Sequence, residues 1–180
     1  IISPGMDRRG PPRPGSMRGG GRPFTMEDYE AVKTIRGVRA IAPVTIRPTF
    51  IVTEETRQPA AITGTTGDYF TVRSLEFASG SWQPASGNQD ANCVVAHRAA
   101  EKFFGTANAT GKTIDLENTT YTVTGVLVPE EQGVFGRSNQ ANAIYVPIAR
   151  LHELPGQDGR VDAMFIDVVS ADSVDSTKDA

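Results

Sequence analysis

Apolar and polar positions repeat most regularly between Cys93 and Val128, where the pattern predicts a strand, a helix and a hairpin in succession. Residues 93–96 form a short apolar run. The next eight residues carry apolar side chains at helical spacing before Gly105, a residue typical of helix C-termini. The buried face of this helix is predicted to consist of Ala99, Ala100, Phe103 and Phe104.

Two alternating stretches follow this helix and predict a pair of strands over residues 112–116 and 120–127, joined through Glu117 and Asn118. In both stretches apolar side chains alternate with polar ones, so one face of the pair is expected to be buried and the other solvent-exposed. The predicted buried positions are Ile114, Leu116, Tyr121, Val123 and Leu127.

A second helix is predicted to begin after Thr25, because Thr25 and Asp28 have the spacing of a capping box with Asp in place of the usual Glu or Gln. Phe24 and Tyr29 occupy the two positions of a hydrophobic staple. We expect about ten residues of helix, an ordinary length, closed by Gly37.

Residues 38–53 are rich in Val, Ile and Thr but contain Pro43 and Pro48, which a central strand tolerates poorly because proline donates no ladder hydrogen bond. The composition therefore predicts a bent or edge strand. Residues 60–65 are its predicted partner, across a turn at residues 57–59. After them a short helical turn is expected to bury Tyr69, Phe70 and Leu75.

The C-terminal third predicts further short elements around a loop. Residues 129–140 hold two glycines, two adjacent glutamates and an isolated apolar pair, Val134 and Phe135, which we regard as a possible contact with a partner. The expected elements are strands over 143–147 and 161–170, a short helix over 148–154, a turn over 155–159 and the start of a helix over 172–180. In the last strand the expected inward positions are Ala163, Phe165 and Val169.

The segment from Gly105 to Thr113 resembles a phosphate-binding loop but has the wrong spacing. Five residues separate Gly105 from the Gly111–Lys112 pair, whereas a P-loop has four, and here a helix precedes the segment and a strand follows it. We interpret the segment as a helix C-cap followed by a turn in which Gly111 has a positive φ.

Composition and charge narrow the class of protein. The 180 residues are 38% hydrophobic, enough for one core or two small subdomains. The net charge is −3, with +4 on residues 1–24 and −7 on the rest, which does not indicate a nucleic-acid partner. The Gly- and Arg-rich residues 6–23 predict a flexible tether, or alternatively a segment that grips anionic lipid headgroups. No apolar run approaches the roughly twenty residues of a membrane helix, so we expect a soluble chain.

The residues that could carry out chemistry do not converge. The only cysteine, Cys93, lies in an apolar strand and is expected to be buried. His97 and His152 have no metal-ligand spacing, since Gly156 stands where HExxH would need its second histidine. No G-x-S-x-G motif occurs, and the adjacent glutamate pairs do not suit paired acid and base catalysis. We therefore predict no catalytic, cofactor-binding or metal-binding residue.

The order of motifs resembles the extracytoplasmic (periplasmic) core domain of MacB-type, FtsX-like ABC transporter permeases. The resemblance covers nearly the whole chain, and its specificity lies in the order and spacing of the motifs together. The matching segments are IISPG, the glycine-rich loop, IRGVRAIAP, ITGTTGDYF, ASGSW, CVVAHRAAEKFFG, GKTIDL, YTVTGVL and AIYVPI. The residues that carry the family motifs in a structural role are Gly67, Asp68, Tyr69, Phe70, Phe104, Gly105, Gly111 and Lys112.

The resemblance implies an α+β architecture with two lobes: a porter-like subdomain of residues 1–66 and 160–180, and an inserted sabre-like subdomain of residues 67–159. It also implies a location on the outer face of a bacterial inner membrane. The implied function is non-catalytic coupling of cytoplasmic ATP hydrolysis to export or release of substrate. The implied partners are a second permease copy, an ABC ATPase subunit or domain and, in some systems, a periplasmic adaptor, with no cofactor and no nucleic acid. The alternative is a membrane-tethered module that binds or senses a substrate or peptide and regulates a partner.

Overall fold

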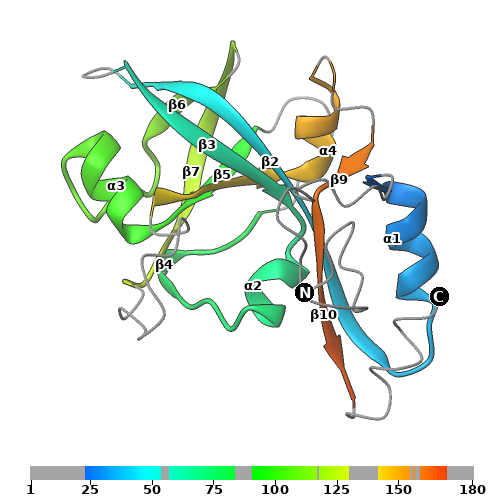
Figure 1. Cartoon of the computed structure of the whole chain (residues 1–180). Helices are drawn as coiled ribbons and strands as arrows, with labels where there is room; N and C mark the ends of the chain where they lie inside the picture. Colours follow the sequence, from blue (N-terminus) through cyan, green and yellow to red (C-terminus); the bar gives the residue numbers. More distant parts are fainter. Residues whose placement is uncertain are drawn as a thin grey trace, which may run out of the picture.

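The computed structural model describes residues 23–53, 57–83, 91–116, 118–129, 142–154, 156 and 159–169. Helices and strands are mixed along the chain, so the fold is α+β, as predicted (Figure 1). The elements in chain order are β1 (Phe24–Thr25), α1 (Met26–Lys33), β2 (Val38–Val52), β3 (Arg57–Thr65), α2 (Asp68–Val72), β4 (Phe77–Gly80), β5 (Asn92–Val95), α3 (His97–Phe104), β6 (Thr113–Leu116), β7 (Thr119–Leu127), β8 (Ile144–Pro147), α4 (Ile148–His152), β9 (Arg160–Val161) and β10 (Ala163–Val168).

Six strands pair in a closed ring, in the order β2, β3, β8, β5, β7 and β6, because β6 pairs both with β7 and back to β2. The closure rests on two positions, where Ile51 lies opposite Leu116 and Val52 lies opposite Asp115. Strands β10 and β4 extend the sheet outside the ring at β2 and β7. The ring therefore joins strands from both of the lobes implied by the resemblance, a division that remains a prediction.

The strand predicted to be bent or at an edge is β2, and it lies inside the sheet order, between β10 and β3. It is long and curved, and runs from beside α1 toward β6 (Figure 1). Its first half pairs with β10, and from Thr45 onward it pairs with β3. The edge prediction is therefore wrong, although each half has a free side along most of its length.

The two prolines are tolerated because each lies where a side of β2 is free. The carbonyl oxygen of Pro43 accepts a hydrogen bond from the hydroxyl of Thr65 at 2.8 Å, so Pro43 faces away from β10. The N–H of Ile46 points to Asp162 rather than to β3. The backbone nitrogen of Pro48, two residues further on, points to the same side of β2 as the Ile46 N–H. On that side β10 no longer pairs with β2, so no ladder hydrogen bond is lost.

Other predicted boundaries need correction. Strand β3 begins at Arg57, not at residue 60, so residues 57–59 are strand and Pro59 pairs with Phe50. The helix after Thr25 ends at Lys33 and is shorter than expected, and Gly37, with φ +96°, lies in the turn that leads to β2. The capping box is confirmed: the Asp28 N–H donates to the Thr25 hydroxyl at 3.3 Å, and the Thr25 N–H donates to the Asp28 carboxylate at 2.8 Å.

The predicted helix and hairpin around residues 93–128 are confirmed closely. The helix is α3, its C-cap Gly105 has φ +65°, and all four predicted side chains on its inner face are buried. Strands β6 and β7 form an antiparallel hairpin whose turn residue Asn118 has φ +65°. The five predicted inward positions, Ile114, Leu116, Tyr121, Val123 and Leu127, are all buried.

The last predicted strand is interrupted at Asp162, which separates β9 from β10. Met164 is the buried residue of β10, while Val169, predicted to face inward, lies beyond its end and is 64% exposed. Both faces of β10 are partly covered, because Phe165 packs with the aromatic residues near α2 and Ile166 packs with the apolar cluster around α1. Three predicted features lie outside the described residues: the tether of residues 6–23 apart from its last residue, residues 172–180, and the pair Val134 and Phe135.

Buried apolar side chains form three clusters. The largest joins the inward side chains of the ring strands, such as Ile51, Ile62 and Leu116, to the inner face of α3. A second lies on the opposite face of the sheet beneath α2 and contains Val44, Tyr69 and Phe70. The third packs α1 against β2, β9 and β10. In Figure 1, α1 and α3 lie on opposite sides of the molecule, so the clusters that they cover lie on different parts of the sheet.

Candidate functional site

One face of β2 is apolar over a stretch that lies outside the core. Alternate residues on that face are apolar along its length, starting with Ala42 and Val44, which are buried in the cluster with α2. Beyond Val44 the same face leaves this cover, yet it stays apolar: Ile46 and Phe50 are each 54% exposed. In a strand that faces water, these alternate positions are normally polar.

Strand β3 continues this exposed face sideways. Phe50 pairs with Pro59, and Pro48 pairs with Ala61, and both partners are exposed. The guanidinium carbon of Arg57 lies 5.0 Å from the centre of the Phe50 ring, a cation–π contact. We name the whole surface the β2–β3 face; its residues are Ile46, Pro48, Phe50, Val52, Pro59 and Ala61.

Strands β6 and β7 border the β2–β3 face with polar side chains. Asp115 lies opposite Val52 and accepts a hydrogen bond from the Thr120 hydroxyl at 2.6 Å. An open groove of about 720 Å³ lies between this polar edge, which includes Asn118, and Phe50. Small-molecule sites are generally enclosed and bury most of their ligand, so an open groove of this kind suits contact with another protein better.

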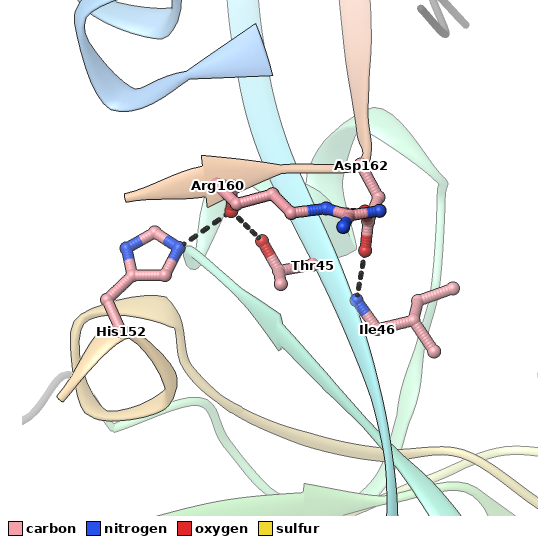
Figure 2. A network of polar contacts seen from close by, with 5 residues as sticks. All are labelled: Thr45, Ile46, His152, Arg160 and Asp162. Carbon is pink, nitrogen blue, oxygen red and sulfur yellow. Dashed lines mark hydrogen bonds and ion pairs between the residues drawn. The ribbon is translucent and has the colours of Figure 1, made fainter. Parts of the chain in front are cut away.

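A network of polar contacts holds β2 at the point where the exposed face begins (Figure 2). The Arg160 carbonyl oxygen accepts a 2.6 Å hydrogen bond from the Thr45 hydroxyl and lies 2.9 Å from His152 Nε2. The Asp162 carboxylate accepts hydrogen bonds from the Ile46 N–H and from Arg160 Nε, each at 2.8 Å. The pairing of β10 with β2 ends at Val44, and beyond it the Asp162 side chain, instead of a strand, is the hydrogen-bond acceptor for β2. The network ties α4 and β9 to the middle of β2.

The residues of the P-loop-like segment serve to end α3. Lys112 Nζ lies 3.5 Å from the Phe104 carbonyl oxygen and 5.8 Å from the centre of the Phe104 ring. A cation at this position offsets the partial negative charge at a helix C-terminus. Gly105 and Gly111 both have positive φ, as the sequence predicted for Gly111. The geometry is that of a helix cap and not of a phosphate cradle.

The residues Gly67, Asp68, Tyr69 and Phe70 begin α2, which covers the first half of β2. Tyr69 packs edge-on against Phe165 and at a tilt against Tyr145, with ring centres 5.4 Å apart in both cases. A side-chain carbon at Gly67 would lie 3.0 Å from the Trp82 ring, so glycine lets Trp82 approach closely. Gly67, Tyr69 and Phe70 thus contribute to the aromatic layer beneath α2, whereas Asp68 is exposed.

The candidate reactive residues are dispersed. Cys93 is buried, as predicted, and burial raises the pKa of its thiol far above the ordinary value. His97 Nε2 lies 3.5 Å from the Glu101 carboxylate one helical turn away, and His152 belongs to the network on β2. Across the described part of the chain, no group of three His, Cys, Asp or Glu side chains could hold a metal ion. Within those same ranges, no helix is long and apolar enough to cross a bilayer.

The comparison with protein families agrees with the order of motifs. Residues 1–180 match the MacB-like periplasmic core domain. The chain therefore belongs to this family of periplasmic domains, and the resemblance inferred from its sequence is confirmed. Among curated proteins, no significant match is found.

Solved structures support the fold. The extracellular domain of the noncanonic ABC-type transporter YknZ from Gram-positive bacteria matches with a TM-score of 0.69 and 23% identity, over 86% of this chain and 78% of that one. The periplasmic region of MacB from Actinobacillus actinomycetemcomitans matches with a TM-score of 0.70 and 18% identity, over 86% and 70%. A domain of a putative permease from Porphyromonas gingivalis matches with a TM-score of 0.56 and 17% identity, over 80% and 63%.

The β2–β3 face was not among the sites predicted from the sequence. The signal was present, since Ile46, Pro48, Phe50 and Val52 occupy alternate positions of one strand. The side on which the core lies decides whether such a row is buried or exposed. The row of Arg47, Thr49 and Ile51 faces the other way, and of these only Ile51 is fully buried.

Proposed function

We propose that this chain is the non-catalytic extracytoplasmic domain of an ABC transporter permease, and that it couples ATP hydrolysis in a separate nucleotide-binding domain or subunit to export or release of substrate outside the membrane. Membership of the MacB-like family supports the setting. The observation that carries the mechanism is the β2–β3 face, because a rigid closed ring that presents an apolar face is suited to transmit force through protein contacts.

The partners in this proposal are a second permease copy, the ATPase and, where one exists, a periplasmic adaptor, all at the outer face of the inner membrane. The division into a porter-like part (1–66 and 160–180) and a sabre-like part (67–159) belongs to the same proposal. Since β3 pairs with β8 and β2 pairs with β6 across this division, we expect the ring strands of the two parts to move together as one unit. The contact assigned to Val134 and Phe135 also remains a proposal.

The test uses the full-length permease that carries this domain. Phe50→Asp places a charge on the β2–β3 face, and we expect transport to fall at least tenfold, because an unpaired charge buried in a contact costs roughly a few kcal/mol. Basal ATP hydrolysis should persist. Val169→Asp is the matched control, since Val169 is an exposed apolar residue beyond the end of β10. Phe135→Asp tests the predicted loop contact in the same assay.

Two results would overturn the proposal. If Phe50→Asp and Val169→Asp both transport normally, the β2–β3 face has no part in transport. If the domain alone turns over a substrate, it is not a non-catalytic domain. The alternative function, a tethered module that binds a substrate or peptide, is supported by the groove beside Asp115 and predicts saturable ligand binding that Phe50→Asp abolishes.

A further inference from the structure

We propose that the β2–β3 face is covered by a second copy of this chain, related to the first by a twofold axis that runs along β2. The inference deepens the proposed function and rests on it in one respect, that two copies are held together in a membrane. Apolar and charged side chains on three neighbouring strands are arranged as such a contact requires.

Arg57, Val52 and Asp115 form a row across the sheet. Arg57 lies opposite Val52 on β3, and Asp115 lies opposite Val52 on β6. Neighbouring strands are about 5 Å apart, so a positive and a negative side chain flank β2 at similar distances. A half-turn about an axis along β2 exchanges the two sides. Arg57 of each copy then faces Asp115 of the other, which forms two equivalent ion pairs.

The side chains on the axis itself are apolar. Ile46, Pro48, Phe50 and Val52 lie along β2, and the half-turn brings this row against its own counterpart. In a twofold contact, a charge on the axis would meet an identical charge. Here the charges lie beside the axis and in opposite signs, which is the self-complementary pattern that such an interface requires.

The same charges argue against a membrane surface as the occupant. An anionic bilayer attracts clusters of several Lys or Arg side chains. The β2–β3 face instead has one cation and one anion on opposite sides, and the Arg57 cation already lies over the Phe50 ring. A surface with both signs selects a partner that presents both signs in the reverse order.

The size of the face sets the expected strength. Three or four strands at about 5 Å spacing, crossed by seven residues of β2 at about 3.3 Å each, cover roughly 400 Å². A stable interface buries about 800 Å² on each partner, so isolated domains should associate weakly. Two copies tethered in one complex reach effective concentrations in the millimolar range, at which a weak contact forms.

The experiment cross-links a cysteine placed on the proposed axis, in membranes that contain the full-length permease. In Val52→Cys the new thiols of two copies face each other, and a bismaleimide with about 10 Å reach suits two sheets packed face to face. Within this domain Cys93 should stay silent, because it is buried and its pKa is raised. Val169→Cys is the control, exposed but distant from the axis. We expect Val52→Cys to cross-link at least tenfold faster than Val169→Cys.

Charge exchange then tests the orientation. In the Val52→Cys background, Arg57→Asp and Asp115→Arg should each reduce cross-linking about tenfold, because each creates two like-charge pairs. Differently tagged copies of the two variants, expressed together, should cross-link to each other at the original rate, because both ion pairs are restored, one with its original polarity and one with the polarity reversed. This rescue also shows that each variant is folded.

Each outcome decides between occupants. If Val52→Cys cross-links no faster than Val169→Cys, or captures a different polypeptide, a second copy does not cover the face and the inference is wrong. If cross-linking is fast but indifferent to the charge exchange, the axis does not run along β2. If cross-linking fails while Phe50→Asp still abolishes transport, the proposed function survives and only this inference falls.

Discussion

The two halves of β2 have the same kind of sequence and opposite surroundings. In the first half, Ala42 and Val44 lie beneath the aromatic side chains of α2. In the second half, Ile46 and Phe50 occupy the same face of the same strand and are each 54% exposed. The strand itself is continuous, and the face that carries Ala42 and Val44 stays apolar as far as Val52. What changes is the layer above it.

In this fold, the layer above an apolar side chain of β2 decides whether that side chain belongs to the core or to a contact surface. Helix α2 is only five residues long, so the cover that it supplies ends abruptly. At the same place β2 changes partner from β10 to β3, and the network around Asp162 marks the boundary. An apolar row that continues past the end of its cover has no role in the core of one chain, which is why we assign it to contact with another.

The largest effect should come from removing the cover itself. Tyr69→Ala takes away a fully buried ring that contacts Phe165 and Tyr145, and we expect it to lower the free energy of unfolding by about 3–5 kcal/mol. Phe50→Ala, the matched aromatic truncation on the exposed half, should cost less than about 1 kcal/mol. Urea unfolding of the domain measures both. Equal losses would mean that Phe50 belongs to the core.

A smaller and cleaner comparison uses two valines eight residues apart on the same face. Val44 is 4% exposed and Val52 is 37% exposed. Replacing each by Thr keeps the volume and exchanges one methyl group for a hydroxyl, which costs about 1–3 kcal/mol when buried without a partner. We expect that loss for Val44→Thr and a change within about 0.5 kcal/mol for Val52→Thr, both read from thermal unfolding. Equal melting temperatures for the two variants would contradict the difference in burial between the two halves.

The smallest effect should lie at the boundary between the two halves. Asp162→Ala removes the carboxylate that binds the Ile46 N–H and Arg160. Because Ile46 is half exposed, water can replace part of the lost bond, and we expect a cost of about 1 kcal/mol. Hydrogen exchange at the Ile46 amide should quicken more than exchange at Ile41 in the covered half. Unchanged exchange at Ile46 would show that the carboxylate does not hold the strand there.

Prediction from sequence worked best where contacts are local. The inner face of α3, the C-cap at Gly105, the turn at Asn118 and the capping box at Thr25 all follow from residues within a few positions of one another. Such features depend on helical spacing and on the φ angles that particular residues allow, and both can be read along the chain.

Prediction failed where distant strands meet. Residues around Pro43 and Pro48 indicated a bent or edge strand, and the edge alternative is wrong, because β10, more than 100 residues later, pairs with the first half of β2 and β3 pairs with the second. Likewise Met164 is buried and Val169 is not. Helix α1 packs on the face of β10 that carries Met164, which is opposite to the face predicted to point inward. Alternation defines two faces of a strand but does not say which face the rest of the chain will cover.

By itself the sequence determined the α+β class, the helix caps at Thr25 and Gly105, the hairpin of residues 113–127 and, through the order of its motifs, the family. Only the tertiary structure decided that six strands close into a ring through Ile51 and Val52. It also decided that the layer of side chains around α2 covers β2 as far as Val44 and leaves Ile46 uncovered. The reason is physical: caps, turns and periodicity arise from the geometry of neighbouring residues, whereas burial depends on what packs above a side chain. The same alternating apolar row thus becomes core in one half of β2 and an exposed face in the other.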